Sequence, residues 1–321
     1  MRALITGASG FAGSHLAEYL LSRGEEVTVI LRRSRAANLE PIASRLLFEY
    51  ADLRDYQAVL RVLREAGPDR LYHLAALSSP KKSLQNPELT YDVNFRGTLH
   101  LLNACRELEL ACRVLYVSSA EVYGVGETQA LPLCENSPLR PVSPYAGSKA
   151  AAEMLALQFF LGYGLPVIRV RPFHHTGPRQ SENFVCSSFA QQIAEVELGL
   201  RSPLVSVGNL KVARDFSDVR DVVKGYYLVL EKGQPGEVYQ LCSGRAIPID
   251  TILQALIALA SKEIRVVVDE SKMRTHDVPS LWGDPSKTRE LGWQPEYRLE
   301  TTLRDLKHYW KRKVADAMGA S

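Results

Sequence analysis

Tyr145 and Lys149 form a Tyr-x-x-x-Lys pattern, the spacing in this chain that most suggests chemistry. Residues four apart share one face of a helix, so a phenol and an ammonium group would point into the same site. A nearby positive charge lowers the pKa of a phenol, which would let Tyr145 exchange a proton with a carbonyl or hydroxyl group near neutral pH. The pair alone is also typical of a solvated helix face. Ser119, at the end of an apolar run upstream, favours the catalytic interpretation, because its hydroxyl can hydrogen-bond the same substrate oxygen.

The N-terminal glycines predict a binding turn for a phosphate-bearing cofactor. Gly7, Gly10 and Gly13 have the spacing Gly-x-x-Gly-x-x-Gly, with Ser9 and Phe11 inside the turn. The turn directly follows an expected strand and opens an expected helix, whose exposed N–H groups and positive dipole end favour a pyrophosphate. A purely structural turn is the alternative, and this context favours dinucleotide binding.

The residues after the second and third expected strands indicate which dinucleotide binds. Folds specific for NAD place Asp or Glu about 20 residues beyond the glycine turn, where it binds the ribose 2′-hydroxyl. Arg32 and Arg33 occupy that place here, and a guanidinium can bind a 2′-phosphate with paired hydrogen bonds. We therefore predict NADP(H), with NAD(H) as the alternative. Asp52, followed by Leu53, could accept a hydrogen bond from the adenine amino group or cap the helix expected from Tyr56.

The elements that must position these residues alternate along the first half of the chain. Apolar, β-rich runs predict strands at Arg2–Thr6, Glu26–Leu31, Leu46–Tyr50, Arg70–Leu74, Arg113–Ser118 and Pro166–Arg171. Amphipathic stretches predict helices at Ala12–Ser22, Tyr56–Ala66, Pro87–Leu108 and from Pro144 onward. This alternation is typical of the α/β class, with βαβ units that build a doubly wound parallel sheet of the Rossmann type.

Beyond Arg171 the pattern changes to loops rich in Pro, Gly and His, a helix near Phe189–Glu197, and a helix, a strand and a terminal helix from Ile249 onward. We expect a second, smaller α/β domain that binds the substrate. The predicted NADP-binding Rossmann domain comprises residues 1–170 and 216–242, and the predicted substrate domain comprises residues 171–215 and 243–321, with a cleft between them.

Composition excludes several other classes of protein. The chain has 321 residues, of which 46% are hydrophobic, enough to bury a large core. Its net charge of +3 comes from Lys and Arg spread along the chain, so we expect no nucleic-acid partner. Five cysteines without a Cys-x-x-Cys pair indicate neither a disulfide framework nor a metal site. The N-terminal apolar run is too short for a signal peptide or a membrane span, so we expect a cytoplasmic protein with no membrane contact.

Taken together, these residues resemble the extended short-chain dehydrogenase/reductase family, over essentially the whole chain. The resemblance implies that Tyr145 is the catalytic acid, and that Lys149 orients the nicotinamide ribose and lowers the pKa of the tyrosine. It implies that Ser119 positions the reacting oxygen. It also implies that Ala75 and Ala76 line the nicotinamide site and that Asn94 supports the lysine, and that members often pair into dimers through a four-helix bundle, for which the helices Pro87–Leu108 and Pro144–Tyr163 could serve.

The second half of the chain resembles the GDP-sugar branch of that family. The stretch Gly208-Asn209-Leu210 stands where members acting on uridine- or thymidine-linked sugars usually carry Gly-Asp-Gly, before the motif Arg214-Asp215-Phe216. A second similar stretch runs from Arg274 to Val278. The resemblance implies that Arg214 and Arg274 hold the diphosphate, that Asp277 binds the guanosine ribose, and that Asn209 lies near guanine.

The segment from Arg171 to Gln180, followed by Phe184 and Val185, most resembles the members that reduce the C4 keto group of GDP-4-dehydro-6-deoxy-D-mannose to GDP-D-rhamnose. This implies NADP(H)-dependent reduction of a GDP-linked 4-keto-6-deoxy sugar, with His174, Arg179 and Val185 near the substrate. The chain departs from those members at His174, where they usually carry Asn.

Two other functions stay open. The first is a GDP-mannose 4,6-dehydratase, which adds a glutamate to eliminate water, and Glu121 stands at the corresponding position. Against it, the loop after Arg171 lacks the Asn-His-Glu-Ser-Pro-Arg-Arg pattern of those enzymes. The second is a non-catalytic NADP-binding regulatory protein, which would be indicated by loss of the tyrosine or the lysine, and both are present.

Overall fold

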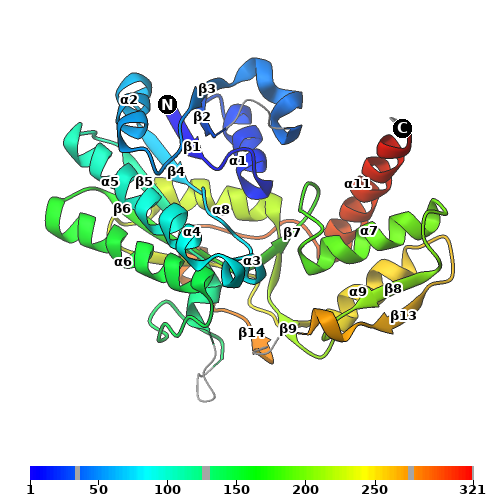
Figure 1. The fold of residues 1–321 in the computed structure, drawn as a ribbon. Helices are drawn as coiled ribbons and strands as arrows, with labels where there is room; N and C mark the ends of the chain where they lie inside the picture. The colour runs from blue at the N-terminus through cyan, green and yellow to red at the C-terminus, as the bar shows by residue number, and fades with distance from the viewer. Residues whose placement is uncertain (33–36, 125–130, 274–277, 320–321) are drawn as a thin grey trace.

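A seven-stranded parallel sheet forms the centre of the molecule (Figure 1). The computed structural model describes residues 1–32, 37–124, 131–273 and 278–319. In the order β11-β6-β5-β4-β1-β2-β3, the strands are β1 (Arg2–Thr6), β2 (Glu26–Leu31), β3 (Leu47–Tyr50), β4 (Arg70–His73), β5 (Arg113–Val117), β6 (Val167–Pro172) and β11 (Val238–Leu241). The predicted doubly wound sheet is confirmed, and β11 adds a seventh strand beside β6 that sequence patterning did not identify.

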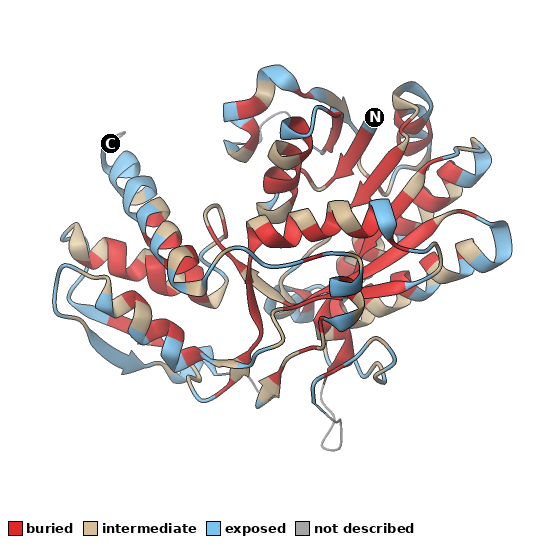
Figure 2. Cartoon of the chain, turned by 180° about the vertical axis from the view of Figure 1, so that it is seen from behind, coloured by how far each residue is buried: buried red, intermediate tan, exposed pale blue. Residues whose placement is uncertain are grey.

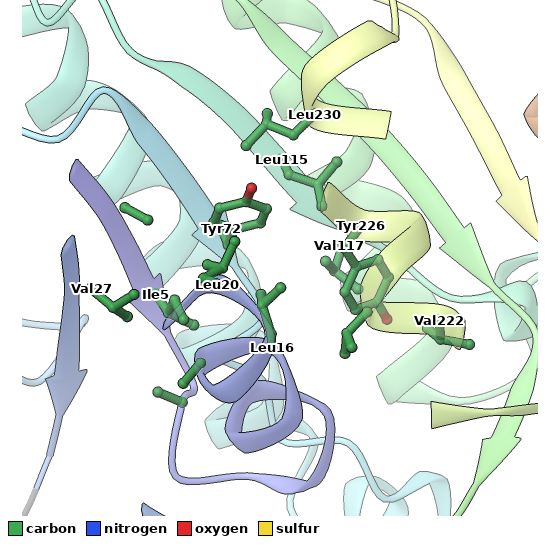
Figure 3. Close-up of a cluster of buried hydrophobic side chains, with 14 of the residues drawn as sticks. Ile5, Leu16, Leu20, Val27, Tyr72, Leu115, Val117, Val222, Tyr226 and Leu230 are labelled. Atoms are coloured by element: carbon green, nitrogen blue, oxygen red, sulfur yellow. The ribbon is translucent and has the colours of Figure 1, made fainter. Parts of the chain in front are cut away.

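Helices cover both faces of this sheet because their apolar sides need burial. The covering helices are α1 (Phe11–Ser22), α2 (Tyr56–Ala66), α5 (Gly97–Glu107), α6 (Pro144–Tyr163) and α8 (Val219–Lys232). One apolar core joins α1 and α8 to the sheet, with Leu16, Tyr72 and Tyr226 among its fully buried side chains (Figure 3). A second core joins α2, α5 and α6 to the opposite face.

The predicted single helix Pro87–Leu108 is wrong in detail. The chain forms α3 (Pro80–Gln85), then α4 (Pro87–Tyr91), a π-helical segment η2 (Asp92–Arg96), and finally α5. A π-helical turn widens the backbone hydrogen bonding to five residues and often marks a functional position. Asn94 lies in the middle of η2.

A smaller group of elements follows the sixth strand (Figure 1). Its helices are α7 (Val185–Glu197), α9 (Ile249–Ala258), α10 (Ser286–Glu290) and α11 (Leu299–Gly319). Its short strands are β7 (His174–Thr176), β8 (Leu204–Val207), β9 (Ala213–Arg214), β10 (Phe216–Asp218), β12 (Ile247–Pro248), β13 (Arg265–Val268) and β14 (Ser280–Leu281). The helices α7, α9 and α11 share a third core, separate from the two that flank the large sheet. The fold is therefore a two-domain α/β structure.

Burial is most complete along the central strands of the large sheet, and each part of the chain also has buried helix faces (Figure 2). The central strands β1, β4, β5 and β6 are almost entirely buried, whereas all four residues of β13 are exposed. Among the described residues, no helix is both long enough and apolar enough to cross a membrane.

Candidate active site

The candidate active site is assembled at the carboxyl ends of the sheet strands, where open α/β folds place their ligands. The helix α6 starts there because Ser143 accepts a hydrogen bond from Ala146 N at 3.1 Å and Pro144 supplies the first helical residue. Tyr145 thus stands in the first turn, and Lys149 lies one turn further on the same face. The backbone N–H of Tyr145 also donates to Ser83 Oγ at 3.1 Å, which ties α6 to α3.

Ser119 reaches the same point from the neighbouring strand. It follows β5 and caps the short helix η3 (Ala120–Tyr123), accepting from Glu121 N at 3.2 Å. Its side chain also hydrogen-bonds the Tyr145 side chain. Ser119, Tyr145 and Lys149 are 9%, 9% and 3% exposed, so a substrate oxygen bound between them would be largely shielded from water.

The predicted direction of the tyrosine pKa is wrong for this structure. Burial raises the pKa of Tyr145 to about 12, the hydrogen bond with Ser119 partly opposes this rise, and the charge of Glu121 adds to it. Burial also lowers the pKa of Lys149 to about 7, against the opposing effect of Glu153. The main cause is desolvation, which disfavours the charged form of both groups. Tyr145 is therefore a neutral phenol at neutral pH.

A buried ion pair anchors the catalytic helix from behind, and sequence reasoning missed it. Glu153, one turn beyond Lys149, is completely buried and accepts from Arg171 Nη2 at 2.5 Å and from Arg171 Nε at 3.0 and 3.1 Å. The same guanidinium donates to Tyr123 Oη at 2.9 Å. The Glu153 spacing from Lys149 is visible in the sequence, but its partner lies on β6 and could not be identified without the fold.

The glycine turn has the shape that a pyrophosphate needs. Gly7 has a φ of +77°, and a Cβ there would lie 2.7 Å from Ala75 N. A Cβ on Gly13 would lie 2.2 Å from Gly7 O, so neither position tolerates a side chain. Gly10 precedes α1 without a side-chain cap, which leaves the N–H groups of that helix end for another acceptor. These residues therefore fit a dinucleotide phosphate group.

The end of β2 and the end of β3 hold the residues predicted for the rest of the cofactor. Arg32 is exposed, and its charge contributes to lowering the pKa of Asp52. Asp52 binds Arg54 with both oxygens, at 3.0 and 2.6 Å, and the pKa of Asp52 falls to about 2 mainly through this contact. The suggestion that Asp52 caps the next helix is wrong, because Asp55 accepts from Ala58 N and caps α2. Leu53, which follows Asp52, is buried.

Asn94 supports the catalytic helix, but not through the lysine side chain that the resemblance indicated. Its side chain accepts from Leu77 N at 2.7 Å and donates to Ser148 Oγ at 2.9 Å. Ser148 in turn donates to the Tyr145 carbonyl at 2.8 Å. Ala75 and Ala76 lie just beyond β4, and the Ala75 N–H donates to Thr6 Oγ1 at 3.2 Å.

Glu121 and His174 form a second polar pair near Tyr145. His174 Nε2 lies 3.3 Å from Glu121 Oε1, and the histidine ring lies 5.7 Å from the ring of Phe216. The Glu121 charge is felt at the Tyr145 hydroxyl, which places this carboxylate in the same electrostatic environment. The pair therefore offers an additional acid–base group beside the tyrosine.

Arg179, predicted to lie near the substrate, contacts the glycine-turn helix α1. Its guanidinium binds both oxygens of Glu18 at 2.7 Å and Ser14 Oγ at 3.2 Å, all on α1. Val185 is the first residue of α7 and is half-buried. Sequence spacing could not reveal the Glu18 contact, because the two residues belong to different parts of the chain.

Two of the remaining predicted substrate residues, Asn209 and Arg214, lie in the smaller group of elements. Arg214 is buried on β9 and donates to the carbonyls of Ala213 and Val278, at 2.8 and 2.7 Å. Asn209 accepts from Lys211 N at 3.0 Å within its own turn. The other two residues, Arg274 and Asp277, lie outside the described residues.

Comparison with known proteins was consistent across sequence and structure. The family model of GDP-mannose 4,6 dehydratase matches residues 4–306. A GDP-6-deoxy-D-mannose reductase from Pseudomonas aeruginosa is 34% identical over 98% of this chain and 99% of its own length. A GDP-mannose 4,6-dehydratase from Yersinia enterocolitica is 33% identical over 93% of this chain and 91% of its own length.

Solved structures share the whole fold. RMD from Pseudomonas aeruginosa complexed with NADPH superposes with a TM-score of 0.86 at 33% identity, covering 98% of this chain and 100% of that one. The UDP-glucose 4-epimerase of Thermus thermophilus in complex with NAD has a TM-score of 0.86 at 31% identity, covering 97% and 99% of the two chains.

Proposed function

We propose a function from one premise: this chain belongs to the GDP-mannose 4,6 dehydratase family, within the extended short-chain dehydrogenases/reductases. The enzyme reduces the C4 keto group of GDP-4-dehydro-6-deoxy-D-mannose and forms GDP-D-rhamnose. The observation that carries this proposal is the hydrogen bond between Ser119 and Tyr145, with Lys149 on the same helix face. The similarity to a GDP-6-deoxy-D-mannose reductase over nearly the full length of both chains supports the choice of substrate.

The cofactor of the proposed reaction is NADP(H), with NAD(H) as the alternative. When bound, its nicotinamide supplies the hydride for the C4 carbon. Gly7, Gly10 and Gly13 hold the pyrophosphate at the open end of α1, and Arg32 pairs with the 2′-phosphate. The solved structure of RMD with NADPH supports the first cofactor, and the epimerase with NAD supports the second.

Tyr145, Ser119 and Lys149 protonate the substrate oxygen and stabilise the charge that develops on it. Because burial keeps Tyr145 protonated at neutral pH, its phenol is in the acid form that reduction requires. Ser119 holds the C4 oxygen in line with that phenol, and the Lys149 ammonium stabilises the negative charge that develops on the oxygen. The non-catalytic alternative finds no support, since the acid, its serine partner and the lysine are present together.

The substrate is bound by residues from the second half of the chain. Arg214 and Arg274 hold the diphosphate, Asp277 binds the guanosine ribose, and Asn209 and Val185 lie near the nucleotide. His174 contacts the sugar beside Glu121. Arg179 is reassigned: its bidentate contact with Glu18 gives it the task of fixing the loop after β7 against α1.

A second candidate function is 4,6-dehydration of GDP-mannose. The specific observation that favours it is Glu121, whose charge reaches Tyr145 and which could serve as the base for eliminating water. The similarity to the dehydratase from Yersinia enterocolitica supports it as well.

An assay with two substrates distinguishes these functions. Purified enzyme is given NADPH with enzymatically prepared GDP-4-dehydro-6-deoxy-mannose, and in parallel GDP-mannose, with products identified by NMR. NADPH oxidation with the keto sugar alone is the expected result. Formation of keto sugar from GDP-mannose without net cofactor consumption would instead identify a dehydratase.

The assembly, location and domain limits belong to this proposal too. The enzyme is a cytoplasmic homodimer that pairs through α4, α5 and α6. Its Rossmann domain comprises residues 1–170 and about 216–242, and its substrate domain comprises about 171–215 and 243–321. Exposed apolar side chains on α6, including Met154 and Leu161, support the dimer, and the packing of α8 and β11 with the large sheet supports the domain limits.

A further inference from the structure

A buried histidine lies between the glycine turn and the catalytic helix, and neither the catalytic nor the binding roles above use it. His73 ends β4 and is 1% exposed. Its Nδ1 lies 2.6 Å from Thr6 Oγ1, at the end of β1, and its Nε2 lies 2.8 Å from Thr98 Oγ1, on α5. Both ring nitrogens are therefore engaged by hydroxyl groups from different elements.

Only one assignment of donors and acceptors fits the two hydrogen bonds of His73. The Thr98 hydroxyl donates its proton to the Asn94 carbonyl at 2.6 Å, so toward His73 it can only accept, and Nε2 must carry the hydrogen. In a neutral ring Nδ1 is then an acceptor, and Thr6 donates to it. Thr6 Oγ1 in turn accepts from Ala75 N at 3.2 Å. The hydrogen bonds run in a single direction from Ala75 to Asn94.

Each end of this chain of hydrogen bonds touches a part of the candidate active site. At one end, the Ala75 backbone packs so closely on Gly7 that a Cβ on the glycine would meet Ala75 N at 2.7 Å. At the other end, Asn94 lies in the π-helical segment η2 and binds Ser148, which donates to the Tyr145 carbonyl. A shift at either end would therefore be transmitted through His73.

The surroundings of His73 keep its ring neutral. Burial, with a smaller contribution from the positive charge of Lys149, lowers the pKa of His73 to about 3. Its ring also packs against Tyr116 at 5.9 Å, and Lys149 Nζ lies 4.8 Å from the centre of the same tyrosine ring. The imidazole therefore keeps one tautomer and one orientation over the working pH range.

We propose that His73 is a positioning residue that couples the cofactor turn to the catalytic helix through the hydroxyls of Thr6 and Thr98. This role of His73 rests on the proposed reductase function only where it is tested by turnover of the keto sugar. It acts through backbone and side-chain geometry at Gly7 and Tyr145, without contact with the reacting atoms.

A matched pair of variants at Thr98 tests the coupling. Thr98→Val keeps the branched shape but removes the hydroxyl, whereas Thr98→Ser keeps the hydroxyl. With the keto sugar as substrate, we expect Thr98→Val to lose about tenfold in kcat and to bind NADPH more weakly, and Thr98→Ser to remain near wild type, because small displacements of catalytic groups are costly. Thermal unfolding confirms that each variant is folded. Equal kcat and NADPH affinity in folded Thr98→Val and Thr98→Ser would overturn the proposal.

A double variant shows whether Thr6 and Thr98 act together through His73 or whether each substitution causes a separate local defect. If Thr6 and Thr98 act through the same ring, Thr6→Val with Thr98→Val should lower kcat no further than the stronger single variant. Multiplication of the two single effects would contradict the coupling.

Two measurements test the role of His73 even if the keto sugar is not the substrate. NADPH binding, followed by its fluorescence, needs no sugar and should weaken in Thr98→Val alone of the matched pair. In ¹⁵N-histidine NMR, we expect His73 in the Nε2–H form from pH 6 to pH 8, with its signals perturbed in Thr98→Val. A titrating ring or an Nδ1–H tautomer would refute the assignment. Loss of sugar turnover with these two results intact would count against the proposed substrate only.

Discussion

At the scale of single residues, the proposed chemistry depends on three side chains whose positions are set by local structure. Ser119 caps a short helix after β5, Tyr145 stands in the first turn of α6, and Lys149 lies buried one turn later. Burial raises the pKa of Tyr145, which keeps its phenol protonated, and lowers the pKa of Lys149, so its ammonium group loses a proton more easily.

Replacing the acid tests the first of these roles. Tyr145→Phe removes the proton donor and the hydrogen bond to Ser119 while keeping the ring in its buried position. We expect kcat with the keto sugar to fall by about 10²- to 10⁴-fold, the usual contribution of a positioned general acid. NADPH affinity, measured by fluorescence titration, should change little. A folded Tyr145→Phe enzyme with near-normal turnover would remove Tyr145 from the mechanism.

The lysine predicts a pH dependence. The pKa of Lys149 is lowered to about 7, so its positive charge is present below that pH and is lost as the pH rises through it. Burial shifts the pKa values of two nearby groups away from this pH, that of His73 to about 3 and that of Tyr145 to about 12. We therefore expect kcat/KM for the keto sugar, which reports the enzyme–NADPH complex before the sugar binds, to fall as the pH increases from 6 to 8.5. A flat profile over this range, at saturating NADPH, would show that the charge of Lys149 is not required.

At the scale of elements, α6 is held in place by a buried charge pair and by three hydroxyl-mediated contacts. Glu153 binds Arg171 on β6, while Ser83, Ser143 and Ser148 fix the first turns. The helix therefore cannot shift along the sheet without breaking contacts in its first turn and at its middle.

The pair predicts a large loss of stability when one partner is removed. Glu153→Gln leaves Arg171 without its buried counter-charge, and breaking such a pair costs roughly 3–5 kcal/mol in the free energy of unfolding. Urea unfolding measures this loss, with Glu65→Gln, on the exposed side of α2, as the matched control. The control should change stability by less than about 1 kcal/mol. Similar stabilities for the two variants would show that the Glu153 pair contributes little.

The elements also show where sequence reasoning succeeds and where it fails. The first six strands of the large sheet and the starts of α1, α2 and α6 follow from local patterns such as apolar runs, the glycine turn and Pro144. The break of the predicted Pro87–Leu108 helix at η2 accompanies contacts with distant residues, of Asn94 with Leu77 beyond β4 and of Thr98 with His73 on β4, so no local pattern predicts it. The sequence leaves Asp52 open as an adenine ligand or a helix cap, and the structure gives the cap to Asp55. The Arg179–Glu18 pair joins distant parts of the chain, so no local pattern predicts it.

At the scale of the whole molecule, one face of the large domain carries exposed apolar side chains. Met154 and Leu161, 43% and 72% exposed, lie seven residues apart and so on one side of α6. Tyr91 on the neighbouring α4 is 42% exposed. Such a patch on adjacent helices favours association with a second copy.

A charged side chain on the exposed apolar face of α6 should dissociate the proposed dimer into monomers. Leu161→Asp places a carboxylate in the proposed helix interface. By sedimentation velocity at micromolar concentration, we expect the wild type to be a dimer and Leu161→Asp to be a monomer. Leu200→Asp, at a similarly exposed position after α7, is the control and should stay dimeric. A monomeric wild type, or a Leu161→Asp variant that remains a dimer, would place the interface elsewhere or exclude it.

Hydride transfer to the sugar is the central claim, and the most direct measurement follows that hydride. The enzyme is mixed with the keto sugar and NADPH deuterated at nicotinamide C4 on the face that is transferred, each face being tested in turn. The product is then analysed by NMR and mass spectrometry. The account predicts one deuterium at C4 of a GDP-6-deoxyhexose for each NADP⁺ formed with one of the two labelled cofactors. Turnover of the sugar with no deuterium at C4 from either cofactor would contradict it.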